Sequence, residues 1–427
     1  MSHIKNWRIA RLVVIFPLVV WLGACSMQSE ELPPTYREIE GMWTDRWILA
    51  GADGAKLEAV LSDMKVAPGE RFEPEQYDTL IEFGPGHWTY EFIKLGDAEF
   101  QRAEQAERAG NRDLARETFL EASVYYYIGK IPYTRDDHYP HYSRAYDKSM
   151  AAYERAGALR DVPLEVVELP FGDGIIRGYA HFAPDTANGP APLIIGSGGI
   201  DTFKVEHIVL AKALNDAGIS VLMADLPGVG ESNYMASVPE HDEVFSGFLD
   251  IMSTHPRVDA DRVGIYAQSW GGNAAAKIAF VDERFKAIAS VCGPVHEALS
   301  PPGWVVSLMP SLVVDAIPVM RRNVLADRLG LTSPMQDSDM AAIAGKARQF
   351  SLVEQGFIGG DRKANTPILI INTDTDPVAP PADMELLASA AHDATVVYTD
   401  SFGHCGSLTA ILDVTVPWLE EHLNERG

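Results

Sequence analysis

The hydrophobic pattern of this chain divides it into two parts. Between about residues 95 and 127, small and apolar residues recur every three or four positions, which is the spacing of an amphipathic helix. From about residue 160 onward, short apolar runs alternate with helical stretches, as in a mostly parallel sheet with crossover helices. The sequence therefore predicts a helical segment over 38–160, followed by an α/β core formed by 161–292 and 367–427.

Within the helical segment, residues 95–110 and 113–127 are rich in helix formers and are separated by Gly110-Asn111. They predict a helical hairpin of the tetratricopeptide kind. One such pair is too short for a solenoid, so we expect it to pack onto the core and wall part of its pocket. The tyrosines of this segment are either helix-packing residues or the lining of an aromatic substrate site: Tyr125, Tyr126, Tyr127, Tyr139, Tyr142 and Tyr146.

A serine follows one of the apolar runs of the core. Val263–Tyr266 predicts a buried strand, Asn273–Phe280 predicts the next helix, and Ser269 lies in the turn between them. So sharp a turn leaves no room for bulk beside the serine. Ala267 and Gly271 are small enough, although glycine is more usual at the position of Ala267. The pattern is that of a nucleophile elbow.

Two later loops supply a candidate acid and a candidate base, in the chain order that this elbow requires. The apolar strand 367–372 is followed by Asp374 and Asp376. Asp376 has the familiar D-x-x-x-P ending, and Asp374 would then be a solvated turn residue. The strand 395–398 is followed by His404. A serine hydroxyl needs an imidazole to accept its proton and a buried carboxylate to fix the imidazole tautomer. The predicted catalytic residues are Ser269, Asp376 and His404; the other eleven histidines are expected on the surface or in packing.

Two backbone segments are candidates for binding an oxyanion. The strand that begins at Pro192 runs into a glycine pair, so Gly199 and Ile200 would bring one amide close to a substrate oxygen, although a glycine pair can equally be a simple turn. The second amide would be that of Trp270, directly after the serine. A further strand ends in D-x-P-G-x-G-x-S at residues 225–232, which we expect to shape the floor of the site without a chemical role.

These motifs resemble those of the α/β-hydrolase fold from about residue 160 to the end of the chain. More narrowly, the chain resembles the esterases related to the fermentation–respiration switch protein and to 2,6-dihydroxypseudooxynicotine hydrolase, in which a helical segment precedes the core. The stretches Gly198–Lys204 and Gln268–Asn273 carry the closest local likeness. The resemblance implies the α/β class, with a doubly wound, mostly parallel sheet and serine hydrolase chemistry.

An insertion at 293–366 separates the two parts of the core and includes the apolar stretches Trp304–Met309 and Leu312–Met320. A segment of this length without core strands is usually a lid, and α/β-hydrolases commonly insert a cap here. Glu297 lies at its entrance. Related carbon–carbon bond hydrolases use an extra acid near this point, so Glu297 is either an auxiliary acid or a solvated loop residue.

The first 24 residues have the pattern of a secretory signal peptide: three basic residues, then a short apolar run, then small residues. Cys25 follows Gly23-Ala24 and resembles the acylated cysteine of a bacterial lipobox, with 25–37 as a tether. Because Ser26 and not aspartate follows, family precedent favours the outer membrane, facing the periplasm. The alternative is an uncleaved single-span anchor.

Charge and cysteine content narrow the classes of partner. The formal net charge of −25 becomes −28 when the three basic residues of 1–24 are removed, which argues against nucleic acid and anionic membrane surfaces as partners. Besides Cys25, the chain has Cys292 and Cys405, and the sequence leaves open whether these two form a disulfide in an oxidising periplasm. No group of His, Cys or carboxylate residues has metal-ligand spacing, so no metal or cofactor is expected.

The sequence thus predicts a serine hydrolase that acts through an acyl-enzyme on a small carbonyl substrate, apolar or aromatic, with a carboxylic ester favoured. One alternative is a carbon–carbon bond hydrolase of 1,3-diketones, which must also protonate a leaving carbanion. Another is a non-catalytic outer-membrane interaction protein on a hydrolase scaffold, against which the intact Ser269, Asp376 and His404 argue. The oligomeric state is not indicated.

Overall fold

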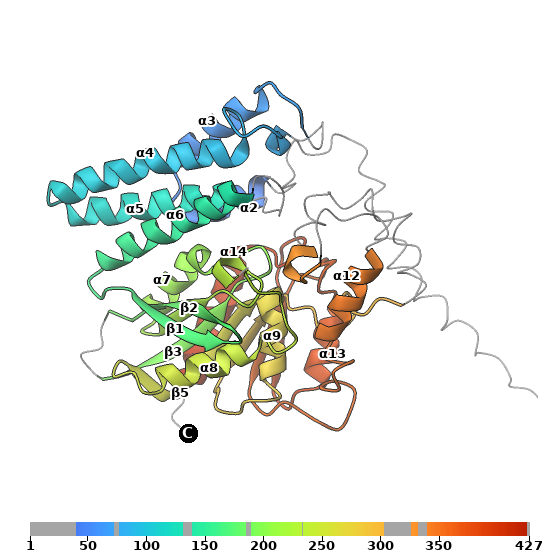
Figure 1. The fold of residues 1–427 in the computed structure, drawn as a ribbon. Coiled ribbons are helices and arrows are strands. Elements are labelled where there is room, and N and C mark those ends of the chain that lie inside the picture. The colour runs from blue at the N-terminus through green and yellow to red at the C-terminus, as the bar shows by residue number, and fades with distance from the viewer. Residues whose placement is uncertain are drawn as a thin grey trace, which may run out of the picture.

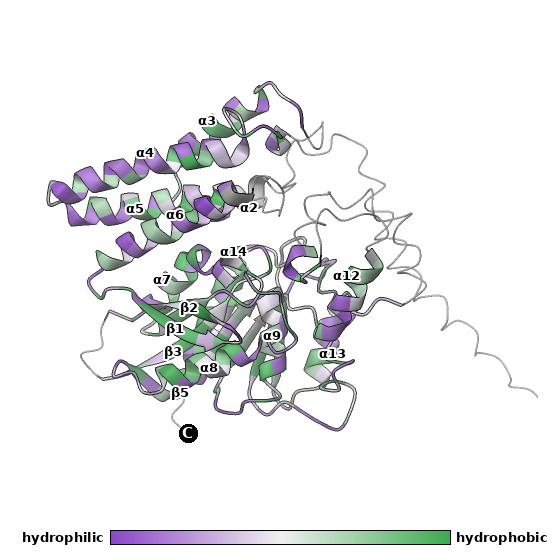
Figure 2. Cartoon of the chain, viewed as in Figure 1, coloured by the Kyte–Doolittle hydropathy of each residue, from purple (hydrophilic) through white to green (hydrophobic). Residues whose placement is uncertain are grey.

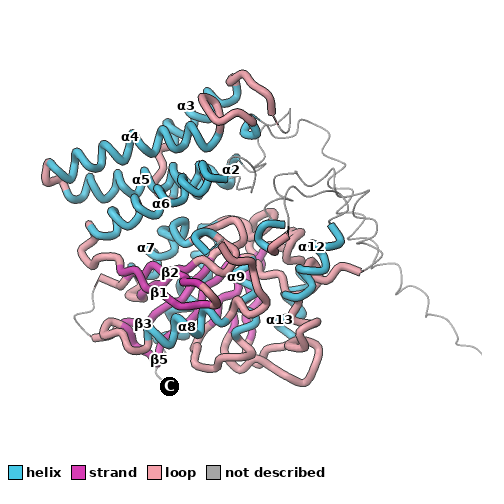
Figure 3. The backbone as a smooth tube through the Cα atoms, viewed as in Figure 1, coloured by secondary structure: helices cyan, strands magenta, loops and turns pink. Residues whose placement is uncertain are grey.

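The N-terminal third of the described chain is a layer of helices beside an α/β core (Figure 1). The computed structural model describes residues 40–71, 77–130, 139–184, 189–232, 234–302, 326–331 and 340–424. The helical layer consists of α2 (Glu40–Leu49), α3 (Gly54–Lys65), α4 (Trp88–Arg108), α5 (Arg112–Gly129) and α6 (Tyr139–Ala158). Figure 3 shows these helices gathered on one side of the sheet.

The predicted helical hairpin is present as α4 and α5, and α6 packs against both. Gly110 takes a φ of 77° in the turn, and the side chain of Asn111 then caps α5 by accepting a hydrogen bond from the Leu114 N–H. Where the two helices approach, Gly96 faces the ring of Tyr126, and a Cβ there would lie 2.6 Å from that ring. This hairpin is therefore fixed by its turn and by one close backbone contact.

The core contains one eight-stranded sheet with the order β1-β2-β4-β3-β5-β6-β7-β8. β1 pairs antiparallel with β2, and β2 with β4, whereas the remaining pairs are parallel. The strands are β1 (Glu165–Phe171), β2 (Gly174–His181), β3 (Ala191–Ser197), β4 (Ser220–Ala224), β5 (Val258–Gln268), β6 (Ile288–Val291), β7 (Ile368–Asn372) and β8 (Ala394–Tyr398). This is the doubly wound, mostly parallel sheet that the sequence predicted.

Both faces of the central strands are apolar, because helices cover each of them. Alternate residues divide between two clusters: Ile194 and Tyr266 face one side, and Ile195 and Ile265 face the other. The helices of the first face are α7 (Ile208–Asp216) and α14 (Leu408–Asn424), and those of the second are α8 (Glu243–Met252), α9 (Trp270–Ile278) and α13 (Pro381–Ser389). Figure 2 shows the hydrophobic colouring concentrated in these strands.

Two predicted helix boundaries were wrong. The helix after Ser269 begins at Trp270 and not at Asn273, since the elbow turns directly into it. The last helix begins at Leu408 and not at Val416, so Pro417 lies inside α14 and not at its start. Proline costs that helix one backbone hydrogen bond. Buried residues such as Leu419 pack on the sheet and outweigh that loss.

Several predicted segments lie outside the described residues. These are the signal sequence with Cys25, and the apolar stretches 304–309 and 312–320 of the insertion. The described part of the insertion includes α12 (Met340–Ala347) and a 3₁₀ turn, η6 (Arg348–Phe350). Among helices in the described ranges, none has the length and apolar character needed to cross a membrane.

Candidate active site

Ser269 lies between the end of β5 and the first residue of α9, as predicted. Its φ of 55° and ψ of −113° are rare for a residue with a side chain, and such strain persists only where the surroundings enforce it. The enforcing contacts are close: a Cβ on Gly271 would lie 2.5 Å from the Gly198 carbonyl oxygen, and one on Gly272 would lie 2.7 Å from Gly293 Cα. Ala267 fits its position without strain, so glycine is required after the serine but not before it.

The three predicted catalytic side chains form one hydrogen-bonded chain. Ser269 Oγ lies 2.8 Å from His404 Nε2, and His404 Nδ1 lies 2.8 Å from Asp376 Oδ2. The Asp376 carboxylate is buried and also accepts hydrogen bonds through Oδ1 from the backbone N–H groups of Val378 and Ala379. Asp374, the competing carboxylate, is exposed. The buried carboxylate therefore fixes the imidazole in the tautomer whose Nε2 can accept the serine proton.

Four of the other histidines in the described ranges are buried, namely His87, His181, His207 and His241. Burial lowers the pKa of His181 to about 3, that of His207 to about 4 and that of His241 to about 3. His241 Nε2 lies 3.0 Å from Asn273 Oδ1, and Asn273 in turn donates to the Pro294 carbonyl. The three imidazoles with a lowered pKa stay neutral in the interior, which agrees with the packing role expected for them.

The loop of His404 (Ser401–Gly406) is held at several points. Gly403, Cys405 and Gly406 all have positive φ, at 80°, 63° and 64°. The Thr373 hydroxyl donates to the Gly403 carbonyl at 2.6 Å, and the Gly403 N–H donates to Thr375 Oγ1 at 3.1 Å. These bonds connect the loop that carries His404 to the loop that carries Asp376. Both loops lie at the carboxyl edge of the sheet.

Two long-range ties hold this loop, and the sequence raised only the second of them, as an open possibility. Arg46 of α2 donates from Nη2 to the Gly406 carbonyl at 3.0 Å, which connects the helical layer to the His404 loop. Cys292, one residue after β6, is joined to Cys405 by a disulfide, with the two Cα atoms 5.1 Å apart. The disulfide that the sequence left open is thus present, next to His404.

The loop after β3 lies directly against the nucleophile. A Cβ on Gly199 would be 3.0 Å from Ser269 Cβ and 3.3 Å from its Oγ. The Gly199 N–H, however, donates to Thr202 Oγ1 at 2.7 Å. The prediction that this amide points at the oxyanion position was therefore wrong, because the amide is hydrogen-bonded to the Thr202 hydroxyl within the loop. Ile200 lies in the same loop, and the N–H of Trp270 has no acceptor within α9 because it is the first residue of that helix.

Gly199→Ala is expected to lower kcat for any reaction at Ser269 by about tenfold to a hundredfold, since the added methyl must displace Ser269 or the loop. The matched control is Gly360→Ala, because nothing lies within 4 Å of a Cβ on that glycine. Steady-state rates of both variants check this expectation. Equal rates for the two variants would show that the loop moves freely away from the serine.

The D-x-P-G-x-G-x-S motif at residues 225–232 connects the helical layer to the loop after β3. Asp225 is buried and accepts hydrogen bonds from the Lys204 N–H at 2.8 Å and from the Tyr146 hydroxyl at 2.7 Å. Burial tends to raise the pKa of Asp225, but Lys204 and these donors lower it below its usual value. The motif has the structural role expected of it.

Tyr125 and Tyr126 donate to Glu121 and Asp97, so within the described part of the segment these tyrosines serve helix packing.

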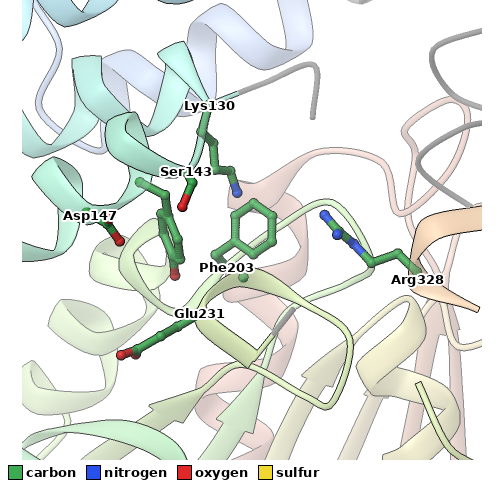
Figure 4. Close-up of a pocket in the computed structure, with 8 residues that line it drawn as sticks. Lys130, Ser143, Asp147, Phe203, Glu231 and Arg328 are labelled. Carbon is green, nitrogen blue, oxygen red and sulfur yellow. The ribbon is translucent and has the colours of Figure 1, made fainter. Parts of the chain in front are cut away.

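A cavity of about 130 Å³ lies between the helical layer and the loop after β3. Lys130 and Arg328 point toward Phe203 from different sides of it (Figure 4). Burial lowers the pKa of Lys130 to about 7, although its partner Glu206, at 3.5 Å, opposes this shift. The lining residues are Lys130, Ser143, Tyr146, Asp147, Phe203, Gly230, Glu231 and Arg328. Half of them are charged, and neither Ser269 nor His404 is among them.

Glu297 is exposed, and only its backbone is held in place. Its N–H donates to Asp383 Oδ1 at 2.8 Å, and the N–H groups of Val295 and His296 also donate to that carboxylate. Burial raises the pKa of Asp383, and these three donors oppose that shift. Asp383 therefore fixes the start of the insertion, a role that its position in the sequence did not reveal.

The sheet order, the elbow and the covering helices are those of an α/β-hydrolase. A family model of FrsA-like esterases matches residues 22–424. The chain therefore belongs to the FrsA-like esterase family.

Curated relatives and solved structures agree with this placement. The chain is 28% identical to Esterase FrsA of Vibrio cholerae over 380 residues, covering 88% of this chain and 86% of that protein. It is 28% identical to Esterase FrsA of Yersinia pestis over 385 residues, covering 90% and 87%. The crystal structure of 2,6-dihydroxy-pseudo-oxynicotine hydrolase matches with a TM-score of 0.68 at 18% identity, over 90% of this chain and 96% of that one. AbyA5 matches with a TM-score of 0.63 at 22% identity, over 88% and 91%. At these identities the two structures show the fold.

Proposed function

We propose that this protein is a serine esterase that hydrolyses a small carboxylic ester through an acyl-enzyme. The observation that carries the proposal is the chain of contacts from Ser269 Oγ through the His404 imidazole to the buried Asp376 carboxylate. A hydroxyl becomes a useful nucleophile only when a base accepts its proton as it attacks. His404 has the position and the tautomer for that task.

The reaction proceeds in two steps. Ser269 Oγ attacks the ester carbonyl while its proton passes to His404 Nε2, and the backbone amides of Trp270 and Ile200 bind the oxyanion. The carbon–oxygen bond to the alcohol then breaks, and His404 returns the proton to the departing alkoxide. Water, deprotonated by His404, attacks the acyl group and releases the acid and Ser269. Asp376 orients the imidazole throughout and stabilises its charged form.

The proposed substrate is small, with an apolar or aromatic group beside the carbonyl. The ring of Trp270, the residue after the nucleophile, packs on that of Phe350 with centroids 4.5 Å apart, and His241 lies against both rings. This aromatic cluster begins at the residue after Ser269, which supports such a substrate.

Hydrolysis of a panel of short p-nitrophenyl esters and of 1,3-diketones, with wild type and Glu297→Gln, tests the substrate class. We expect ester hydrolysis, with the Glu297→Gln rate within about twofold of wild type because this side chain is exposed. Glu385→Gln, an exposed change on α13, is the control. Turnover of the diketone that disappears in Glu297→Gln alone would instead support carbon–carbon bond hydrolysis.

We also propose that Cys25 carries a lipid anchor and that the protein is held at the outer membrane, facing the periplasm. The pattern of residues 1–25 supports this proposal. Several acyl chains on one cysteine, each contributing about 0.8 kcal/mol for every buried methylene, are enough for stable anchoring. Metabolic labelling with an alkyne fatty acid should mark the wild type and not Cys25→Ser; equal labelling of both would exclude Cys25 as the acceptor.

A further inference from the structure

The Cys292–Cys405 disulfide lies directly beside the proposed base. Cys405 is the next residue after His404, and Cys292 reaches it from the end of β6 across a sequence separation of 113 residues. Both cysteines are buried, whereas the His404 side chain keeps 24% of its surface accessible. His404 is therefore the most accessible of these three residues.

The side chains also have the separation of a metal site. One ring nitrogen of His404 and the two cysteine sulfurs all lie within 4.8 Å of one another. Tetrahedral zinc, with bonds of about 2.3 Å to sulfur and about 2.0–2.1 Å to nitrogen, holds such donors about 3.3–3.8 Å apart. Once the sulfur–sulfur bond is open, these side chains can form a Cys₂His set with one open position. While the sulfurs are bonded to each other, neither is a thiolate, and the set cannot bind the ion.

The His404 loop has ties that do not depend on the disulfide. The bonds from Thr373 to Gly403, and from Arg46 to Gly406, hold the loop on both sides of Cys405. The Cys405 N–H also contacts Asp376 Oδ2 at 3.4 Å. After cleavage of the sulfur–sulfur bond, we therefore expect both thiols to stay near the imidazole.

We propose that reduction of the Cys292–Cys405 disulfide creates a site for zinc, formed by the two cysteine thiolates and His404. A dithiol reductant opens the bond by thiol–disulfide exchange, giving two cysteine thiols and the oxidised reductant. Zinc then displaces one proton from each thiol and binds a lone pair of the imidazole. The nitrogen that binds the metal gives up its present hydrogen bond, with Ser269 or with Asp376. Either loss stops His404 from acting as a base.

The oxidised and the metal-bound forms exclude each other, so zinc would stop hydrolysis by the reduced protein and leave the oxidised protein active. This consequence for activity rests on the proposed function, whereas the binding of zinc does not. The sequence did not reveal this site because its ligands come from two loops that only the sheet brings together.

The test is a zinc titration of the full chain carrying Cys25→Ser, which leaves only the two cysteines of interest. A phosphine reductant is used and removed before the titration, because dithiols themselves bind zinc. A competing chromophoric chelator reports the affinity. We expect the reduced protein to bind one equivalent, and the oxidised protein to bind none in this range. His404→Ala and Cys292→Ser should each weaken binding to the reduced form by about tenfold or more. His392→Ala, a change at an exposed histidine, should leave it unchanged.

Equal zinc affinity of the oxidised and reduced forms, or of the reduced parent and reduced His404→Ala, would overturn the proposal. His404→Ala keeps both cysteines and the Thr373 and Arg46 ties, so it tests the ligand set even if the cysteine variant folds poorly. The titration contains no substrate. A protein that binds zinc only after reduction but hydrolyses no ester would contradict the proposed function alone, and the reverse result would contradict the metal site alone.

Discussion

Ser269→Ala is expected to abolish ester hydrolysis, with kcat lower by about 10⁴–10⁶-fold, and to abolish labelling by a fluorophosphonate. The substitution removes one oxygen, the atom that lies 2.8 Å from His404 Nε2. No other hydroxyl is shown in contact with that nitrogen among the residues that the structure describes. Rate measurement and gel-based detection of the probe check the two expectations independently.

The fold should survive this change. Ser269 holds its strained backbone through the Gly271 and Gly272 contacts and the hydrogen bond from its N–H to the Val291 carbonyl, none of which involves the hydroxyl. Thermal unfolding should therefore occur at nearly the wild-type temperature. Ser253→Ala, at an exposed serine, is the control for the probe. A probe label that persists on Ser269→Ala would falsify the assignment of the nucleophile.

The elbow could be predicted from sequence because its requirements are local. A strand, a turn and a helix within about twenty residues leave room only for small side chains around Ser269, and small residues are visible in the sequence. The choice between Asp374 and Asp376 could only be ranked, since both follow the same strand. Burial separates them in the structure: Asp376 faces His404 from the interior, and Asp374 faces solvent.

Contacts between distant segments could not be predicted in the same way. Arg46 and Gly406 are 360 residues apart, and neither stands in a pattern that indicates the other. Their contact depends on how the helical layer lies on the sheet, which in turn depends on packing such as that of Tyr146 on Phe203, with ring centroids 5.1 Å apart. Sequence periodicity shows which face of a helix is apolar but not what covers it.

The oxyanion loop illustrates an intermediate case. The glycine pair correctly marked the place where the backbone approaches Ser269, because a Cβ on Gly199 would lie only 3.0 Å from Ser269 Cβ. The direction of the Gly199 amide was not predictable, since it depends on whether Thr202 turns its hydroxyl toward that amide. A close approach is a steric property that glycine reports, whereas hydrogen-bond direction depends on the fold of the whole loop.

Asp376→Asn is expected to lower kcat by about 10⁴-fold with little change in KM. Asp376 Oδ1 accepts from the N–H groups of Val378 and Ala379, so the amide oxygen of the asparagine takes that position and its NH₂ replaces Oδ2. This NH₂ donates to His404 Nδ1 and holds the proton on Nε2. In this neutral tautomer Nε2 already carries a hydrogen, so it cannot accept the proton of Ser269, although every heavy atom stays in place.

Asp374→Asn is the matched control, with the same chemical change two residues away on an exposed side chain. Its rates should stay within about twofold of wild type. Fluorophosphonate labelling of Asp376→Asn should slow in parallel with ester hydrolysis, because both reactions need the serine proton to be removed. A large loss in Asp374→Asn together with normal rates in Asp376→Asn would reverse the assignment of the acid. A loss in both, with unchanged unfolding temperatures, would mean that the loop after β7 acts as a unit and that burial alone does not identify the residue that orients His404.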